Sequence, residues 1–329
     1  MKLKTNQLIW SAVLTIFALG FTACADLEEV SPTFDAEVAL YDIPTTIDRM
    51  QNGIPSNAGA ANERRNPGPT FSTFNAALGS TGLASVFSRN DLTAFAPTDA
   101  AFAELGLNPG NVRNQPGLRE ILLYHVVAGT VLSTDLTNTF VQTVNGQFIE
   151  ISADNGTING AEIVAADIRA RNGVIHAIDA VLLPPSQNIV EVALGNENFS
   201  ILVEAVVAAG FVELLATTND LTVFAPTNDA FVDLLGELGF DSLEELIDEE
   251  DGIGLAGLQG VLAYHVFAGR VFSTDLSNGT ITMFLGDEMT VDVSGPSLID
   301  QNDRTSGIVA TDIQATNGVI HVIDKVILP

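Results

Sequence analysis

The residues best suited to chemistry in this sequence are four histidines, which form two pairs at matching places: His125 with His265, and His176 with His321. General acid–base catalysis or zinc binding would need them clustered with carboxylates. Their spacing favours another role. His125 and His265 follow apolar residues by three, four and seven positions, which is one helical face, and His176 alternates with apolar residues along a predicted strand. We interpret all four as core side chains with satisfied hydrogen bonds, and predict no catalytic residue and no metal site.

Polar residues beside these segments have helix-start or turn roles by the same reasoning. Asp99, Asn228 and Asp229 follow Pro-Thr pairs, where a threonine can cap a helix and an acidic residue suits its positive end. Asp135 and Asp275 follow Ser-Thr pairs and are predicted to lie in turns or caps.

One glycine pattern, GIGLAG at 252–257, matches the spacing of a dinucleotide-binding loop. No predicted strand precedes it, and the acidic run 248–251 would repel a phosphate. That run also lacks the ligand spacing of a calcium-binding loop, so we interpret 248–254 as a solvated insertion. The sequence contains no GxSxG, P-loop or HExxH motif. No cofactor is predicted, although a hydrolase with an unrecognised site stays open because catalytic groups are brought together in space.

The single cysteine, Cys24, follows a segment typical of an export signal. Lys2 and Lys4 precede a nearly continuous apolar run over 8–21, which is short for a membrane span. We predict a lipoprotein signal peptide at 1–23 and lipid attachment at Cys24, the alternative being an ordinary cleaved signal with an incidental cysteine. The acidic residues at 26–29 resemble the surface-export signal of Bacteroidetes-type lipoproteins.

Composition narrows the classes of partner. The chain of 329 residues carries 41 acidic and 13 basic residues, a net charge of −28. Nucleic acid and anionic lipid headgroups both need clustered Lys and Arg, so neither is a predicted partner. Residues 24–69 contain five prolines and little periodicity, and are predicted to form a flexible tether.

The rest of the chain is a repeat in which three segments occur twice in the same order. They read LTAFAPTDAAFAEL and LTVFAPTNDAFVDL at 92–105 and 221–234, LLYHVVAGTVLSTDL and LAYHVFAGRVFSTDL at 122–136 and 262–276, and NGVIHAIDAVLLP and NGVIHVIDKVILP at 172–184 and 317–329. The copies are too long for a solenoid repeat. They predict two domains, at 70–185 and 186–329.

Each copy has the same expected order of elements. A helical stretch comes first, then a short strand, further helices ending at the Tyr-His pair, and a run of strands. Three Asn-Gly pairs, at 145–146, 155–156 and 278–279, are predicted to be hairpin turns. Helices followed by antiparallel strands favour the α+β class.

The three repeated segments resemble the signatures of the fasciclin domain family, over roughly residues 70–329. The resemblance implies tandem domains, each a wedge of two β-sheets with a helical layer, acting in adhesion or matrix interaction. In that family the Tyr-His region has been linked to adhesion, so Tyr124, His125, Tyr264 and His265 are a predicted interaction region.

These observations together predict an exported, non-catalytic, cell-envelope lipoprotein that is lipid-anchored in the outer membrane and displayed on the cell surface. Its expected partner is an unknown cell-surface, matrix or polysaccharide ligand, besides the membrane that it reaches through the lipid anchor. A periplasm-facing ligand-binding or envelope scaffold protein is the alternative, and a hydrolase is the less favoured third interpretation.

Overall fold

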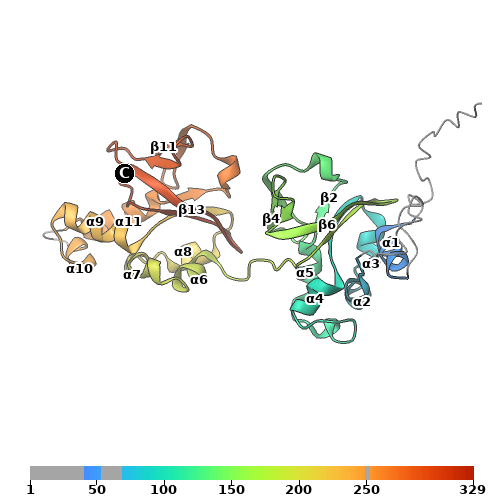
Figure 1. Cartoon of the computed structure of the whole chain (residues 1–329). Coiled ribbons are helices and arrows are strands. Elements are labelled where there is room, and N and C mark those ends of the chain that lie inside the picture. Colours follow the sequence, from blue (N-terminus) through green and yellow to red (C-terminus); the bar gives the residue numbers. More distant parts are fainter. Residues whose placement is uncertain (1–40, 53–68, 249, 251) are drawn as a thin grey trace, which may run out of the picture.

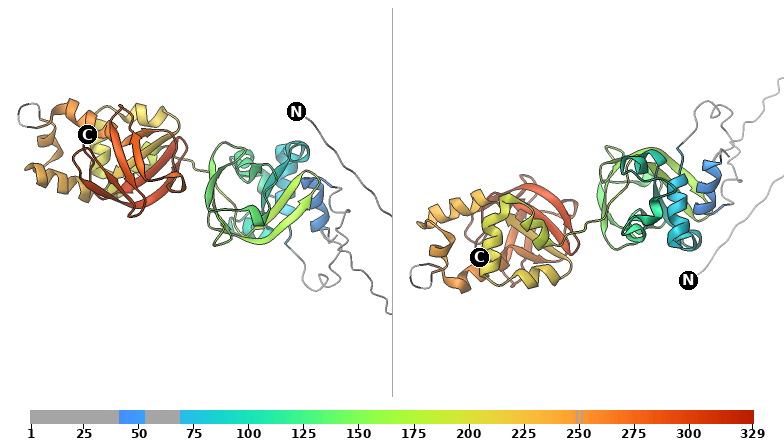
Figure 2. Two further views of the ribbon diagram at one scale, coloured as in Figure 1. Left: turned by 90° about the horizontal axis from the view of Figure 1, so that it is seen from above. Right: turned by 90° about the horizontal axis from the view of Figure 1, so that it is seen from below.

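The computed structural model describes residues 41–52, 69–248, 250 and 252–329. The predicted signal peptide, Cys24 and most of the predicted tether lie outside the described residues. Within them the chain forms two lobes of matching construction, joined by the segment 182–188, as the three views in Figures 1 and 2 show. The tandem organisation and the α+β class are confirmed.

In each domain the helices precede most of the strands. In domain 1 they are α1 (Ile43–Gln51), α2 (Ser72–Thr81), α3 (Ala84–Arg89), α4 (Asp99–Glu104), the 3₁₀ turn η3 (Val112–Asn114), α5 (Leu118–Tyr124) and η4 (Ser133–Asp135). In domain 2 they are α6 (Ile189–Leu194), η5 (Glu197–Phe199), α7 (Ser200–Ala208), α8 (Val212–Thr217), α9 (Asn228–Leu238), α10 (Leu243–Leu246), α11 (Gly254–Tyr264) and η6 (Ser273–Asp275).

The described part of the chain forms two sheets of seven strands each. Domain 1 contains β1 (Leu92–Pro97), β2 (Val126–Ala128), β3 (Thr139–Gln142), β4 (Phe148–Ser152), β5 (Thr157–Ile158), β6 (Ala161–Ala170) and β7 (Gly173–Ile178), in the order β2-β1-β7-β6-β5-β4-β3. Domain 2 contains β8 (Leu221–Pro226), β9 (Val266–Ala268), β10 (Gly279–Thr282), β11 (Glu288–Asp292), β12 (Ser297–Ile299), β13 (Thr305–Ala315) and β14 (Gly318–Ile323), in the order β9-β8-β14-β13-β12-β11-β10.

The first and last strands of each domain pair in parallel, which the sequence pattern did not predict. Leu92 lies opposite Gly173 in domain 1, and Leu221 lies opposite Gly318 in domain 2. Gly173 has a φ of +141°, and a side chain there would overlap the carbonyl oxygen of Leu92. The glycine of the repeated Asn-Gly-Val segment therefore allows the first strand to approach the last.

The wedge predicted from the family resemblance is a single sheet bent along β6. One end of β6 pairs with β5 and the rest pairs with β7, with register shifts between Ile163 and Ile168. Asp167 has a φ of +58° within this irregular stretch, a left-handed conformation that Asp tolerates better than most residues. The bend brings the ends of the sheet together, since Val127 forms a bridge with Thr143.

The sheet separates two hydrophobic cores in each domain. In domain 1, Ile175 and Ala177 of β7 pack with the helices, whereas Ile178 packs with Phe95 and the strands β4 to β6. Because both faces of β7 are covered, it is buried along almost its whole length. Domain 2 repeats this division.

The structure corrects the predicted tether at 43–51, which is helix α1 of domain 1. The side chain of Asp42 caps the helix and Pro44 lies in its first turn, where a proline needs no amide hydrogen. Ile43 and Ile47 are fully buried in the helical core. The prolines that indicated a tether include one that lies in the first turn of a helix.

Two of the three predicted Asn-Gly turns are confirmed, at 145–146 and 155–156. The third prediction was wrong. Gly279 is the first residue of β10 and pairs with Val291, while Asn278 accepts a hydrogen bond from the amide of Val293. The turn of domain 2 that corresponds to 145–146 lies between β10 and β11, with Gly286 in a left-handed conformation.

Candidate functional site

The Tyr-His pairs, Tyr124-His125 and Tyr264-His265, lie at the ends of α5 and α11 and face the interior. All four side chains are at most 2% exposed. The hydroxyl of Tyr124 donates to the carbonyl of Phe148 at 2.7 Å, and that of Tyr264 donates to Glu288 at 2.7 Å. Each tyrosine thereby joins a helix to the beginning of strand β4 or β11. The predicted interaction role of these residues stays a prediction, and in this structure their side chains offer no exposed surface.

The imidazoles of these pairs are neutral hydrogen-bonding groups of the core. The Nδ1–H of His125 donates to the carbonyl of Ile121 at 2.7 Å, and its Nε2 accepts from the amide of Leu182 at 2.9 Å. Because a carbonyl can only accept and an amide can only donate, these partners fix the tautomer. His265 is held in the same way by Val261 and Ile327.

Burial lowers the pKa of both His125 and His265 to about 4, against a weaker opposing effect of the backbone hydrogen bond. Protonation would place a charge in the core and remove the acceptor that Nε2 provides. The interpretation of these histidines as satisfied core residues is confirmed.

His176 and His321 lie beside a serine and an aspartate, which are the components of a nucleophilic triad. The Oγ of Ser133 donates to Asp167 at 2.5 Å and its amide donates to the same carboxylate at 2.8 Å. His176 is turned to the main chain instead, donating from Nε2 to Val131 at 2.9 Å and accepting at Nδ1 from the amide of Asp167 at 3.4 Å.

This order differs from that of a triad, where the imidazole stands between the serine and the carboxylate and takes the serine proton. In domain 1 the serine bonds to the carboxylate directly. Burial alone would raise the pKa of Asp167, but the hydrogen bonds from Ser133 outweigh it and lower that pKa. Domain 2 repeats the arrangement with Ser273, Asp312 and His321. The geometry supports the bend of the sheet rather than nucleophilic chemistry.

The helix-start residues after the Pro-Thr pairs have wider roles than the sequence indicated. Thr98 and Thr227 cap α4 and α9, as predicted. The carboxylate of Asp99 reaches across to the first turn of α2, where it accepts from the amides of Ser72 and Thr73. Asn228 does the same for α7. These side chains therefore fix the mutual position of two helices in each domain.

Asn172 and Asn317, at the start of the repeated Asn-Gly-Val segments, are buried residues whose role the sequence pattern did not indicate. The Oδ1 of Asn172 accepts from the amide of Ile43 at 3.1 Å, while its Nδ2 donates to the carbonyls of Phe87 at 2.5 Å and Asn90 at 2.8 Å. One side chain thus joins α1 and the end of α3 to β7. Asn317 makes the equivalent bonds in domain 2.

The two domains contact each other at a set of residues that we call the domain junction. Phe140 and Phe148 come from domain 1 and Phe272 from domain 2. The rings of Phe140 and Phe272 stack, with centroids 4.0 Å apart and planes 5° from parallel, and Phe148 packs against Phe272 at 5.1 Å. Phe272 is only 2% exposed.

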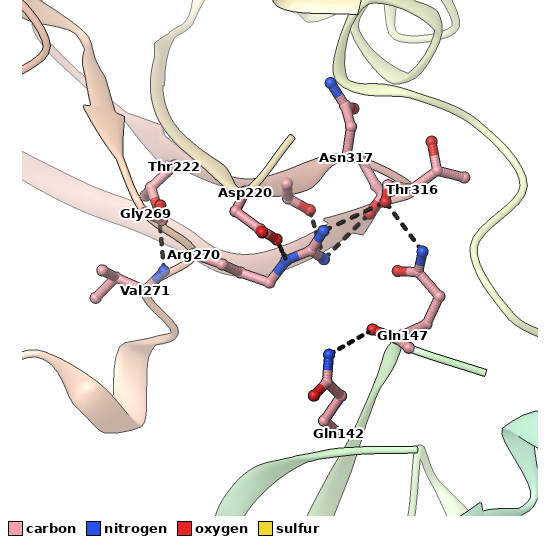
Figure 3. A network of polar contacts seen from close by, with 12 residues as sticks. Gln142, Gln147, Asp220, Thr222, Gly269, Arg270, Val271, Thr316 and Asn317 are labelled. Carbon is pink, nitrogen blue, oxygen red and sulfur yellow. Dashed lines mark hydrogen bonds and ion pairs between the residues drawn. The ribbon is translucent and has the colours of Figure 1, made fainter. Parts of the chain in front are cut away.

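The polar contacts of the domain junction converge on the carbonyl oxygen of Thr316 (Figure 3). The Nε2 of Gln147, from domain 1, donates to the carbonyl of Thr316 at 3.0 Å. Arg270 donates to the same oxygen at 3.3 Å and forms an ion pair with Asp220 at 3.5 Å. The guanidinium of Arg270 also lies 5.4 Å from the ring centre of Phe148, within the range of a cation–π contact.

Each domain contributes residues to the domain junction that its counterpart lacks. The positions of Phe140 and Phe148 in domain 1 are occupied by Thr280 and Glu288 in domain 2. Conversely, domain 1 has Thr130 and Leu132 at the positions of Arg270 and Phe272. This complementarity within an otherwise similar pair of domains indicates a specific contact. Comparing the two copies position by position could have found it in the sequence.

We expect Phe140→Ala to free the domains from each other while leaving both folded. The change removes an aromatic pair worth about 1 kcal/mol beyond the area that it buries. Amide ¹⁵N relaxation should then report a shorter rotational correlation time for each domain. Thr280→Ala, at the equivalent exposed position of β10, is the matched control and should leave the correlation times unchanged. Identical relaxation in Phe140→Ala and the unchanged protein would contradict a coupling role for the domain junction.

Two absences hold for the described part of the chain. No three His, Cys, Asp or Glu side chains gather there in a way that could hold a metal ion. Among the same residues, no helix is both long and apolar enough to cross a membrane.

The described residues thus form two similar α+β domains in tandem, each with a bent mixed sheet, a helical layer and a buried Tyr-His pair. The chain belongs to the fasciclin domain family, whose model matches residues 69–184 and 197–329. Proteins of this family are in general adhesion or matrix-interacting proteins without catalytic activity, and they are secreted or displayed on surfaces.

Individual relatives show how far the similarity extends. Protein sll1483 of Synechocystis sp. is 41% identical over 144 residues, 44% of this chain and 74% of that protein. Transforming growth factor-beta-induced protein ig-h3 of Sus scrofa is 31% identical over 256 residues, 75% of this chain and 35% of that protein. Human periostin is 28% identical over 270 residues, 80% of this chain and 30% of that protein. The chain therefore spans about a third of the length of the last two relatives.

A solved FAS1 domain pair from the insect cell adhesion molecule fasciclin I is also similar. It is 20% identical, with a TM-score of 0.40, over 78% of this chain and 96% of that chain.

Proposed function

We propose that this chain is a cell-envelope lipoprotein whose two fasciclin domains mediate adhesion, or bind extracellular matrix or glycans, without catalysis. The observation that carries the proposal is the use of the chemistry-bearing residues. The histidines, and the serine and aspartate beside them, serve the core and the bend of the sheet in both domains alike. Family membership supplies the general expectation of adhesion.

The proposed geometry of binding follows from the domain junction. Two domains held at a defined angle present their outer surfaces as one unit, so weak contacts on each domain can add to a useful avidity. A lipid at Cys24 would hold this unit at the membrane, since the apolar run before that cysteine is typical of a signal peptide.

The experiment that tests the function is attachment of whole cells. Cells lacking the gene should lose attachment or biofilm formation on at least one matrix, glycan or cell surface, and the unchanged gene should restore it. Undiminished attachment on every surface tried would reject adhesion. Proteinase treatment of intact cells distinguishes the alternative, because full protection of the protein would favour a periplasm-facing ligand-binding or scaffold protein.

The anchor has its own test. We expect Cys24→Ser to abolish incorporation of labelled palmitate and to release the protein from the membrane fraction, because acylation requires the thiol. The unchanged protein is the control. Continued labelling of the Cys24→Ser protein would show that Cys24 is not the acceptor and that the anchor is wrongly placed.

A further inference from the structure

Domain 2 contains an apolar cavity of about 90 Å³ between its helical layer and its sheet. Side chains of α6, α7 and α8 form its outer walls, and β8, β14 and the end of α11 form its floor. The cavity reaches the surface, because two of its lining side chains, Leu194 and Val207, are 63% and 60% exposed. A second hollow of about 40 Å³ adjoins it and shares Phe211, Leu215 and Val266.

At two positions that line this cavity, domain 1 carries larger side chains that are fully buried. The third residue of α2 is Phe74, where α7 has Leu202, and the fourth residue of α3 is Phe87, where α8 has Leu215. The rings of Phe74 and Phe87 pack edge to face at 6.2 Å and are fully buried.

At a third position, too, domain 1 carries the larger side chain. The fifth residue of α1 is the buried Ile47, whereas α6 has Ala193 at that place. At two further positions domain 2 carries the larger side chain. Val223 replaces Ala94 of domain 1, and Phe211 replaces Leu83. The remaining cavity lies where domain 1 places phenyl rings, so its shape suits an aromatic or branched aliphatic side chain.

The rim of the cavity differs between the domains as well. Leu194 and Val207 correspond to Asp48 and Gly79 of domain 1. Leu214 and Leu285 continue the apolar surface over the second hollow, with 38% and 61% exposure. Contiguous exposed apolar side chains around a hollow are typical of an interaction surface rather than of ordinary solvent-facing helices.

The charged side chains of the three helices that form the outer walls are all acidic. The three helices that form the outer walls each carry an exposed glutamate, namely Glu191, Glu204 and Glu213, and none of them carries a Lys or Arg. A partner that brings basic residues around its apolar contact would be attracted, and an acidic one or a fatty-acid carboxylate would be repelled.

We propose that this cavity receives one phenylalanine or leucine side chain from a basic segment of a protein partner. Size and chemistry favour that occupant over a free small molecule. Small-molecule sites usually enclose several hundred Å³ and include placed polar groups, whereas this lining is almost entirely apolar. Protein–protein hot spots are typically a few anchor side chains that fill desolvated pockets on the partner.

The test uses the purified protein and short synthetic peptides rich in Lys and Arg, which differ only in a central Phe or Ala. The Phe peptide should bind roughly ten- to a hundredfold more tightly, since burial of a phenyl group contributes roughly 1.5–3 kcal/mol. Filling the cavity with the side chains of domain 1, by Leu202→Phe with Leu215→Phe, should abolish this preference and leave the weaker, salt-sensitive binding of the Ala peptide.

A second variant keeps the test decisive if the filled protein does not fold. Leu194→Asp places the residue of domain 1 at an exposed rim position and should also remove the preference for Phe. Leu105→Asp, at a Leu of domain 1 that is 47% exposed, is the matched control and should retain it. Equal binding of the two peptides, or an unchanged preference in the filled protein, overturns the proposal.

Toluene separates the remaining class of occupant. If toluene raises the melting temperature of the unchanged protein but not of the filled variant, and no peptide preference is seen, the cavity is a small-molecule site and the proposal fails. The inference adds a partner chemistry to the proposed adhesive function. The peptide measurement needs no cells, so its outcome is independent of the attachment assay.

Discussion

Lowering the pH from 7.5 to 5 should destabilise each domain by about 2 kcal/mol through its Tyr-His histidine alone. The unfolded histidine has a pKa near 6.5, whereas burial lowers the folded pKa of His125 and His265 to about 4. The unfolded state therefore binds more protons in this window. The contribution of the neutral histidine to stability is fully present above pH 6.5 and is lost as the pH falls towards 4. Burial also lowers the pKa of His176 and His321, which adds to the effect.

Hydrogen exchange of β7 and β14, followed by mass spectrometry, reports the stability of each domain separately in the intact chain. The carboxylates of Asp99 and Asp167 accept hydrogen bonds that hold their pKa values below the ordinary value of an aspartate, so these two groups stay charged across the window. In His125→Gln the pH dependence of β7 exchange should flatten by about 2 kcal/mol while that of β14 is unchanged. An equal pH dependence of β7 in both proteins would show that His125 does not control it.

The second large effect is expected from Asn172→Ala, which should lower the stability of domain 1 by about 3 kcal/mol. The change removes three hydrogen bonds and leaves the buried amide of Ile43 without its acceptor. Urea unfolding followed by circular dichroism measures the loss, and exchange of α1 should accelerate more than that of α4. Asn317→Ala should affect domain 2 equally.

Asn155→Ala is the matched control for this experiment. Asn155 is exposed and makes one side-chain hydrogen bond, to Ser152, so its replacement should cost less than about 0.5 kcal/mol. If Asn172→Ala were as mild as Asn155→Ala, the buried hydrogen bonds of Asn172 would contribute little, and α1 would be held by apolar packing alone.

The sequence predicted what depends on local pattern. The two copies, their α+β class, the threonine caps and the core position of the histidines all follow from repeats and from spacing along one segment. The parallel pairing of β1 with β7 was not predicted, because it joins residues far apart in the chain. Helix α1 was not predicted, because the sequence alone does not distinguish a proline in the first turn of a helix from a proline in a tether.

The candidate binding surfaces were missed for a different reason. The cavity and the domain junction come from differences between the copies, at Leu202 and Leu215 and at Phe140 and Phe272, whereas the prediction used what the copies share. A shared Asn-Gly-Val segment marked Asn172, but its three partners lie in α1 and near α3, so its role depends on the folded chain.

The likeness of the strands has a consequence for folding. β1 and β8 read LTAFAP and LTVFAP, and β7 and β14 read GVIHAI and GVIHVI, so the first strand of one domain can pair in register with the last strand of the other. Strand exchange between neighbouring repeats is thus the expected misfolding route of this chain. The helical layers oppose this exchange. Phe74 and Phe87 pack in the helical core of domain 1, whereas Leu202 and Leu215 pack in that of domain 2. The same differences in side-chain size that leave a cavity in domain 2 therefore favour the packing of each helical layer on the sheet of its own domain.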